Sequence, residues 1–485
     1  MDMLLILDFG GGQSLSVARR IRGENVYCEI LPYNADAQTI REKAPKGLLL
    51  VGGTQDAQAD CAQEIYDMGL PMLCMGYGAR IAVKHFGGEL GASLLENRPS
   101  HIEFDESPLF AGLSECDRML DRADEWTLPE GFASIASGAG FDAAFACEEK
   151  KIYGLQFYPE ANDLDGLQIL ANFAQICGCE KQWTVQNLIE EQIEKIRAQV
   201  GEGHALIAIS GGVDSTVCAV LMHNAIGRRM HCLHVDTGLM RKEESAHIAQ
   251  VFGDMGMDLR TVDAGERFLN LLAGVTDAET KRRLVEEEFV RVFEEEADKM
   301  EVDFLVQGTI YNDLLDSASL GGMLASGKMP GMQRFAGLVE PLRTMFKSEV
   351  RQLGTALGLP ADMVHRQPFP GPGLAVRCIG EVTKEKLDIL RDADMIFREE
   401  IKSAGLDKKI RQYFAVLTNM QSGSQTGAYT VALRAVHSVG SADAAVRLPY
   451  DLLEKCVQRI TTEVRGVARV VYDISGNPPS AVEWE

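Results

Sequence analysis

The stretch Ala205-Leu-Ile-Ala-Ile-Ser-Gly-Gly-Val-Asp-Ser215 decides the fold of the middle of this chain. Residues 205–209 are wholly apolar, which is typical of a strand buried on both faces of a parallel sheet. The stretch that follows, 216–222, predicts a helix. Between the two, glycines let the backbone close around an anion, and Ser210 and Ser215 add hydroxyl donors. A buried strand, a glycine turn and a helix amino terminus therefore predict a phosphate-binding loop.

A plain strand-to-helix turn, with serines that cap the helix, is the alternative interpretation of SGGVDS. The complete six-residue pattern after a buried strand favours the phosphate site over that alternative. The loop is not a Walker loop, because it lacks the lysine of the GK[ST] pattern. The sequence thus indicates a phosphate-binding loop of another class.

The length of 485 residues fits two or three domains, each large enough to bury its own core. Short apolar runs at 4–7, 47–51, 71–75 and 152–157 alternate with glycine-rich turns and helix-like stretches, which predicts a parallel α/β domain over residues 1–180. A second parallel α/β domain is expected over residues 181–370, with strands at 205–209, 231–235, 260–262 and 303–306. Residues 371–485 follow a rigid Pro/Gly connector and mix helices with strands, so the third domain is expected to be α+β.

Composition narrows the classes of function. A formal net charge of −23 argues against a nucleic-acid partner, because phosphate backbones are bound by clustered Lys and Arg. No run of 18 apolar residues occurs, so we expect no membrane segment and a cytoplasmic protein. The 11 cysteines are scattered without a CxxC pair, which favours reduced thiols over a zinc site.

Six segments of the chain match one family of enzymes. They are HVDTGLMRKEE (234–244), GVTDAETKRR (274–283), QGTIYNDLLDS (307–317), VEPLRTMFKSEVR (339–351), RQPFPGPGLAVR (366–377) and RVVYDISGNPPSAVEWE (469–485). On these segments and the SGGVDS loop the chain resembles the GMP synthetases over essentially its whole length. The resemblance implies a flavodoxin-like class I amidotransferase domain, an adenine-nucleotide α-hydrolase-like ATP pyrophosphatase domain, and a smaller α+β domain that forms a homodimer.

The resemblance also implies an ATP site with Mg²⁺. Its ATP-binding residues would be Ser210, Gly211, Gly212, Val213, Asp214, Ser215, Val235, Asp236, Gln307, Gly308 and Lys347. Asp313 and Asp316 are the implied metal-facing carboxylates, with charges on a helix surface as the alternative. For Lys347, a solvated lysine is the alternative to a phosphate contact. ATP would adenylate an acceptor oxygen, and ammonia would then displace AMP.

The amidotransferase domain departs from the family pattern at its catalytic residues. The family's nucleophile elbow reads G-x-C-Y-G, whereas this chain reads Cys74-Met-Gly76-Tyr-Gly78. The family's Q-F-H-P-E reads Gln156-Phe-Tyr158-Pro-Glu160, so only the acid that would orient the base is kept. A Cys/His pair without Cys and without His cannot form a thioester. We therefore expect no glutaminase activity, and Cys74, with no histidine beside it, should stay protonated.

The residues expected to bind the acceptor also depart from the family pattern. Residues 319–337 lack the family's lid histidines, Gln367 replaces a histidine, and Asn477 replaces a phosphate-binding lysine. Loss of that lysine removes a charge-assisted contact worth about 1.5–3 kcal/mol. The implied acceptor-binding residues are Arg366, Gln367, Asn477 and Glu483, although Arg366 and Glu483 could equally be structural.

Three hypotheses follow. The first is an ATP pyrophosphatase that aminates a purine-nucleotide-like acceptor, xanthosine monophosphate (XMP) or a relative, with ammonia from outside the chain. The second keeps adenylation but changes the acceptor. The third is a non-catalytic nucleotide-binding paralogue that regulates or pairs with an active synthetase.

Overall fold

A computed structural model describes residues 1–53, 59–158, 164–311, 313, 334–421, 428–439, 442–478 and 480–484. The chain divides into two compact units, unit 1 (Met1–Leu188) and unit 2 (Ile189–Glu485). Apart from residues 181–188, which belong to unit 1, the second and third domains expected from the sequence fall within unit 2, so the boundary near residue 370 stays a prediction. None of the helices in the described ranges is long and apolar enough to span a membrane.

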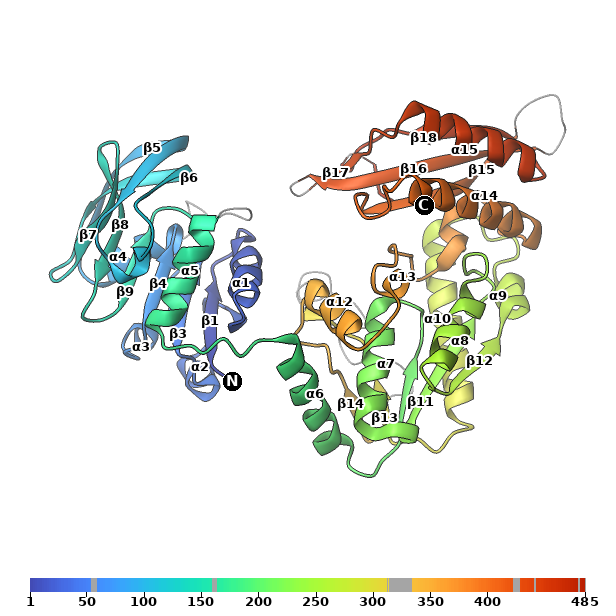
Figure 1. The fold of residues 1–485 in the computed structure, drawn as a ribbon, viewed down its shortest axis with the longest axis horizontal. Coiled ribbons are helices and arrows are strands. Elements are labelled where there is room, and N and C mark those ends of the chain that lie inside the picture. Colours follow the sequence, from blue (N-terminus) through green and yellow to red (C-terminus); the bar gives the residue numbers. More distant parts are fainter. Residues whose placement is uncertain are drawn as a thin grey trace. The chain divides into compact units, whose positions relative to one another are not determined.

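Unit 1 is built on a nine-stranded sheet in the order β2-β1-β3-β4-β9-β8-β7-β5-β6 (Figure 1). Its strands are β1 (Met3–Asp8), β2 (Tyr27–Pro32), β3 (Gly47–Val51), β4 (Met72–Met75), β5 (Glu89–Phe104), β6 (Glu115–Thr127), β7 (Ala133–Gly138), β8 (Phe141–Cys147) and β9 (Ile152–Leu155). The strands from β2 to β9 pair in parallel, which confirms the parallel sheet expected from the apolar runs. The remaining half, from β8 to β6, is antiparallel and was not predicted.

The helices of unit 1 follow the parallel strands. They are α1 (Gln13–Gly23), α2 (Ala37–Lys43), α3 (Gln63–Tyr66), α4 (Tyr77–His85) and α5 (Leu164–Ile176), with one 3₁₀ turn, η1 (Pro108–Phe110). Strands β1 and β3 are neighbours although β2 lies between them in sequence. The carboxyl end of that pair is a topological switch point, where open α/β sheets bind ligands. Two glycine turns meet there, since the N–H of Gly53 donates to the carbonyl of Gly10 at 2.7 Å.

Unit 2 contains a fully parallel five-stranded sheet in the order β12-β11-β10-β13-β14. Its strands are β10 (Ala205–Ala208), β11 (Met230–Asp236), β12 (Leu259–Asp263), β13 (Phe304–Val306) and β14 (Gly337–Val339). The four strands predicted in this region are confirmed. The strand order reverses between β10 and β13, so the loop after β10 lies at the switch point of this sheet.

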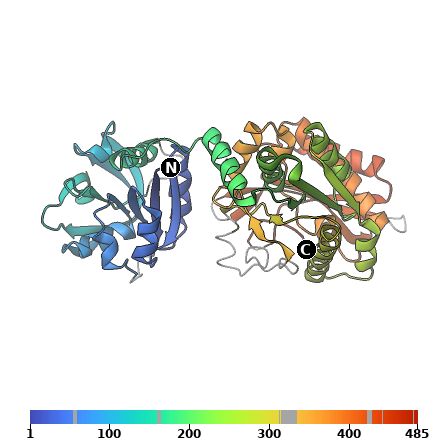
Figure 2. The same cartoon turned by 90° about the horizontal axis from the view of Figure 1, so that it is seen from below.

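Helices flank the five-stranded sheet on both sides (Figures 1 and 2). They are α6 (Val185–Val200), which begins in unit 1, α7 (Val213–Ile226), α8 (Glu244–Asp254), α9 (Gly265–Leu271), α10 (Ala278–Ala297), α12 (Lys347–Ala356) and α13 (Ala361–Val364), with the 3₁₀ turns η2 (Gly227–Arg229) and η4 (Gly373–Arg377). Helix α7 carries no polar stripe, because ten of its residues are buried. It is therefore a core helix, and its amino terminus is held rigidly after β10.

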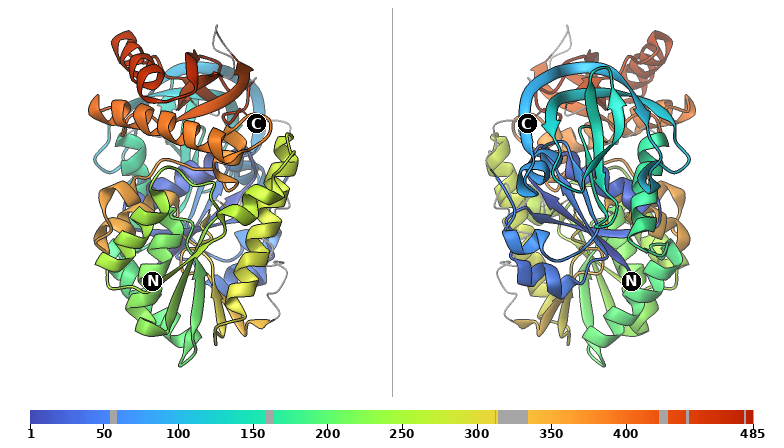
Figure 3. Two further views of the ribbon diagram at one scale, coloured as in Figure 1. Left: turned by 90° about the vertical axis from the view of Figure 1, so that its right-hand side faces the viewer. Right: turned by 90° about the vertical axis from the view of Figure 1, so that its left-hand side faces the viewer.

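The C-terminal part of unit 2 is a second, smaller sheet covered by two helices. It comprises α14 (Lys384–Ser403), β15 (Gln412–Gln421), β16 (Tyr429–Val439), β17 (Ala442–Ala445), α15 (Tyr450–Glu463) and β18 (Val467–Asp473). Strand β16 pairs antiparallel with β15 and β17 and parallel with β18. Both views of Figure 3 show these elements at one end of unit 2. The α+β character expected for this region is confirmed.

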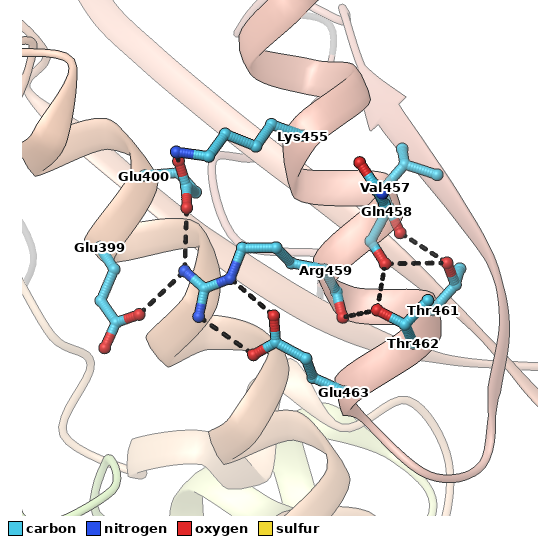
Figure 4. A network of polar contacts seen from close by, with 9 residues as sticks. All are labelled: Glu399, Glu400, Lys455, Val457, Gln458, Arg459, Thr461, Thr462 and Glu463. Atoms are coloured by element: carbon cyan, nitrogen blue, oxygen red, sulfur yellow. Dashed lines mark hydrogen bonds and ion pairs between the residues drawn. The ribbon is translucent and has the colours of Figure 1, made fainter.

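A cluster of charges joins α14 to α15 (Figure 4). Arg459 donates to Glu399 at 3.0 Å, to Glu400 at 2.9 Å and to Glu463 at 2.8 Å. The Glu400 side chain is only 5% exposed and also pairs with Lys455 at 2.7 Å. Burial opposes ionisation of Glu400, but hydrogen bonds from Lys455 and Arg459 outweigh it and lower the pKa of this carboxyl.

Replacing Arg459 with Ala should destabilise unit 2 by about 1–2 kcal/mol, because three carboxylates lose a shared cation and one of them is buried. Because the pKa of Glu400 is lowered on folding, this stabilisation is present above its unfolded value of 4.5 and is lost as pH falls through the folded value. A series of urea unfolding curves between pH 7 and pH 3 measures both effects. Arg283→Ala, which removes an exposed pair within α10, is the control and should change stability by less than about 0.5 kcal/mol. A loss of unfolding free energy in Arg459→Ala as small as that in the control would contradict this account.

Candidate functional site

The loop predicted to bind phosphate connects β10 to α7 at the switch point of the unit 2 sheet. Gly211 has a φ of +75°, and a Cβ there would lie 2.4 Å from Ile248 Cδ1 and 2.6 Å from Arg366 Nη1. The two serines close the loop on itself: the hydroxyls of Ser210 and Ser215 lie 3.3 Å apart, and the Gly212 N–H donates to Ser210 Oγ at 3.3 Å. Only glycine fits position 211, which explains the first glycine of SGGVDS.

Lys347 and Asp214 meet at the amino termini of α12 and α7. The ammonium of Lys347 forms an ion pair with Oδ2 of Asp214. Oδ1 of Asp214 is buried and has no hydrogen-bond partner among the residues that the structure describes. Carboxylate oxygens are ligands that a hard cation such as Mg²⁺ prefers. Asp214 is thus one carboxylate of this site with an oxygen available to a cation.

Both residues line a cavity of about 650 Å³, which is large enough for a nucleotide. The predicted ATP-site residues that line it are Ser210, Gly212, Val213, Asp214, Val235 and Lys347. Two predicted acceptor residues, Arg366 and Gln367, line the same cavity. The phosphate loop and the start of the Pro/Gly connector therefore share one space.

The other predicted ATP residues lie close to this loop without lining the cavity. A Cβ on Gly308 would lie 3.1 Å from the backbone nitrogen of Ser215, so the turn after β13 packs against the start of α7. The backbone N–H of Gln307 donates to the carbonyl of Val339 at 3.0 Å. Asp236 accepts from the N–H of Gly238 at 2.9 Å and shapes the turn after β11. These residues support the walls of the site.

Of the two carboxylates expected to face a metal, Asp313 lies among the described residues and Asp316 does not. Asp313 is exposed, and its Oδ2 accepts from the N–H of Ile310 at 3.0 Å. Asp316, like the lid segment up to residue 333, lies outside the described residues. Within the described ranges, no group of three or more His, Cys, Asp and Glu side chains is placed to hold a metal ion.

Sequence reasoning missed one wall of the cavity. It comes from α10, whose lining residues are Arg282, Val285, Glu286, Phe289 and Val290. The spacing of these residues follows one face of a helix, and that pattern was the available signal. Arg351 of α12, one turn after Lys347, also lines the cavity and was not singled out.

The remaining acceptor candidates, Asn477 and Glu483, do not line this cavity. Glu483 accepts hydrogen bonds from Arg377 Nε at 3.0 Å, from Arg377 Nη2 at 2.9 Å and from Gln412 at 2.9 Å. Arg377 is fully buried, so this pair anchors the C-terminal tail to η4. The backbone of Asn477 forms an antiparallel bridge with Asp443, with bonds of 2.7 and 2.9 Å.

In unit 1, the turn between β4 and α4 has the geometry of a nucleophile elbow. Gly76 lies there with φ 55° and ψ −114° as the residue before α4. A Cβ on Gly76 would lie 2.1 Å from the hydroxyl oxygen of Tyr158 and 2.4 Å from its Cζ. Real side chains do not approach so closely. The phenol of Tyr158 therefore fills the space that a side chain at position 76 would need.

Tyr158 cannot act as a base in this setting. Its hydroxyl donates to the carbonyl of Gly52 at 3.4 Å. Burial raises the pKa of Tyr158 to about 12, against opposing interactions with the backbone of Tyr77 and Gly52. Cys74 is fully buried in β4, and burial raises the pKa of its thiol well above the ordinary value. Glu160 lies outside the described residues.

A cavity of about 400 Å³ adjoins this turn. Its walls include Arg80, Asp121, Arg122 and Tyr158. Both arginines point to one buried carboxylate: Arg80 lies 2.8 Å from Oδ2 of Asp124, and Arg122 lies 2.5 Å from its Oδ1. The segment 121–124 is thus held by an internal charge cluster.

Comparison with known proteins gives three family models along the chain. Residues 5–177 match "Glutamine amidotransferase class-I", residues 184–388 match "NAD synthase", and residues 399–484 match "GMP synthase C terminal domain". Among curated relatives, the "GMP synthase [glutamine-hydrolyzing]" of Acetivibrio thermocellus is 47% identical, and that of Caldicellulosiruptor saccharolyticus is 46% identical. Each alignment covers 100% of this chain and 99% of the relative.

The contact between Gly76 and Tyr158 leads to a prediction for unit 1. Gly76→Ala should destabilise it by about 1–3 kcal/mol, because the methyl group overlaps the phenol. In the double variant with Tyr158→Ala, much of that lost stability should be recovered. Tyr158→Ala alone should lower stability, because it leaves a cavity. A double-mutant cycle by urea unfolding measures the coupling. Additive effects of the two substitutions would show that the side chain of Tyr158 does not fill this space.

Proposed function

Because this chain belongs to the GMP synthase family, we propose that it is an ATP pyrophosphatase that aminates a purine-nucleotide-like acceptor with free ammonia and has no glutaminase activity of its own. The observation that carries the proposal is the contrast between its two sites. The phosphate loop lines a nucleotide-sized cavity, and the paired Lys347 and Asp214 are among its lining residues. The elbow of unit 1 lacks a nucleophile and is filled by Tyr158.

The proposed chemistry begins at the α-phosphorus of ATP. An oxygen of the acceptor attacks it, the bond to the bridging oxygen breaks, and pyrophosphate leaves with the electron pair. Ammonia then attacks the adenylated carbon, AMP leaves, and the nitrogen loses a proton to solvent. Adenylation is needed because an amide-like oxygen is a poor leaving group, whereas AMP is a good one.

The chain's residues assist the departure of pyrophosphate. The N–H groups at the start of α7 and the ammonium of Lys347 lie on one side of the cavity, where they stabilise negative charge on the leaving group. Mg²⁺, held with the nucleotide by Asp214, would neutralise part of the phosphate charge. Arg366 and Gln367 lie where they can contact an acceptor beside ATP. Asn477 and Glu483 remain acceptor candidates by family resemblance alone, as Asp313 and Asp316 remain metal candidates.

XMP is the first acceptor to test, since the relatives are named for the synthesis of GMP. The lost lysine at position 477 favours a weaker or a different acceptor, so relatives of XMP belong in the same experiment. The homodimer and the cytoplasmic location expected from the sequence stay predictions.

The purified chain, given ATP, Mg²⁺, XMP and a high concentration of ammonium, should form AMP and pyrophosphate. Replacing ammonium by glutamine should give no product and no glutamate, because no thioester can form at Gly76. AMP formation with another acceptor, but not with XMP, would assign a different substrate. Glutamate release would contradict the proposed loss of glutaminase, and absence of AMP with every purine nucleotide tested would contradict the proposed synthetase.

Lys347→Met should lower the rate of pyrophosphate formation by about ten- to hundredfold, because a charge-assisted contact to phosphate is worth about 1.5–3 kcal/mol. Lys384→Met removes an exposed lysine of α14 and is the control, with no effect expected. Steady-state pyrophosphate release measures both variants. Equal rates for Lys347→Met and the unaltered chain would show that Lys347 does not contact the phosphates.

A further inference from the structure

Arg366 joins two loops that both line the nucleotide cavity. Its Nη1 donates to the carbonyl of Ser210, the first residue of the phosphate loop, at 3.2 Å. Its Nη2 lies 2.5 Å from Oε1 of Glu244, the first residue of α8. Both side chains are largely buried, with 12% of Arg366 and 11% of Glu244 exposed. Such a pair has a fixed geometry and is screened little by water.

Glu244 extends this link toward the loop that follows β11. Its second oxygen, Oε2, accepts from the backbone N–H of Arg241 at 3.1 Å. Residues 237–243 connect β11 to α8, and Thr237 and Met240 of this connection line the cavity. One carboxylate therefore ties the β11 loop to Arg366, and Arg366 ties it to the phosphate loop.

The glycine at position 211 fits the same arrangement. A Cβ there would lie 2.6 Å from Nη1 of Arg366, so the missing side chain is what lets the guanidinium reach the carbonyl of Ser210. The ring of Phe369 lies 5.8 Å from the Arg366 guanidinium and supports it from the connector. The guanidinium is thus held on several sides.

We propose that Glu244 and Arg366 form a positioning pair that fixes the phosphate loop relative to the β11 loop, so that ATP meets both in one geometry. The inference rests on the proposed function in that it takes ATP as the ligand of this cavity. It gives Glu244 a role that it otherwise lacks, and it makes Arg366 a positioning residue for the nucleotide before any contact with the acceptor.

The test measures MgATP binding by calorimetry in the full chain, without an acceptor. Glu244→Gln and Arg366→Gln should each weaken MgATP binding by about ten- to hundredfold, because small displacements of positioning loops have effects of this size. The double variant should bind no more weakly than the weaker single variant, because the two residues act as one unit. Arg366→Lys should give an intermediate loss, since one ammonium cannot hold both Ser210 and Glu244.

Two controls separate positioning from folding. Arg459→Ala breaks a partly buried ion pair on α15 and should lower stability without changing MgATP affinity. Thermal unfolding of each variant without nucleotide reports its stability. If a glutamine variant does not fold, the test uses Glu244→Asp and Arg366→Lys, which keep the charges of the pair.

The outcomes distinguish this inference from the proposed function. Unchanged MgATP binding in Glu244→Gln and Arg366→Gln, with only the KM for the acceptor raised, would overturn the positioning role and make Arg366 an acceptor ligand. Additive losses in the double variant would overturn the idea of a single unit. If the unaltered chain does not bind MgATP, the proposed function fails first and the inference fails with it.

Discussion

The close approach of Arg366 to the carbonyl of Ser210 is the contact on which the nucleotide cavity depends. It needs a glycine at position 211, a carboxylate at Glu244 to neutralise the buried guanidinium, and a rigid connector at 366–372 to deliver the side chain. These elements are far apart in sequence, and the order of strands in the five-stranded sheet brings them to one edge. The fold thereby turns a short glycine loop into one wall of a defined cavity.

Both units contain the same strand, glycine turn and helix, but the turn has different surroundings in each unit. Each ends a buried parallel strand in a glycine turn that starts a helix, β4 into α4 in unit 1 and β10 into α7 in unit 2. In unit 2 the turn lines a cavity with Lys347 and with an oxygen of Asp214 that has no hydrogen-bond partner within the described part of the chain, a setting suited to phosphate. In unit 1 the turn at Gly76 meets the phenol of Tyr158, which leaves no room for a nucleophile. Gly76 and Tyr158 are thus matched in their packing, because the phenol occupies the space that a side chain at position 76 would need.

Much of the parallel architecture could be predicted from the sequence because its signals are local. Residues 205–208 are apolar without interruption and form the central strand β10, and the glycine pattern after them marks the loop. Strand β6 gave no such signal, since charged residues occupy both of its faces, with Arg118 and Asp124 buried, and its place in the sheet depends on pairing with β5. Contacts between distant residues were beyond local reasoning, as the pair of Arg377 with Glu483 illustrates. The roles of Glu244 and of the α10 wall needed the structure for the same reason.

The central claim is that this chain activates an acceptor with ATP but takes its nitrogen from free ammonia. The most direct measurement follows the source of that nitrogen in the product. The purified chain is given ATP, Mg²⁺, acceptor, unlabelled ammonium and glutamine carrying ¹⁵N in its amide, and the aminated product is examined by mass spectrometry. The account predicts a product without ¹⁵N, because the turn at Gly76 cannot release the amide. Incorporation of ¹⁵N from glutamine would contradict it.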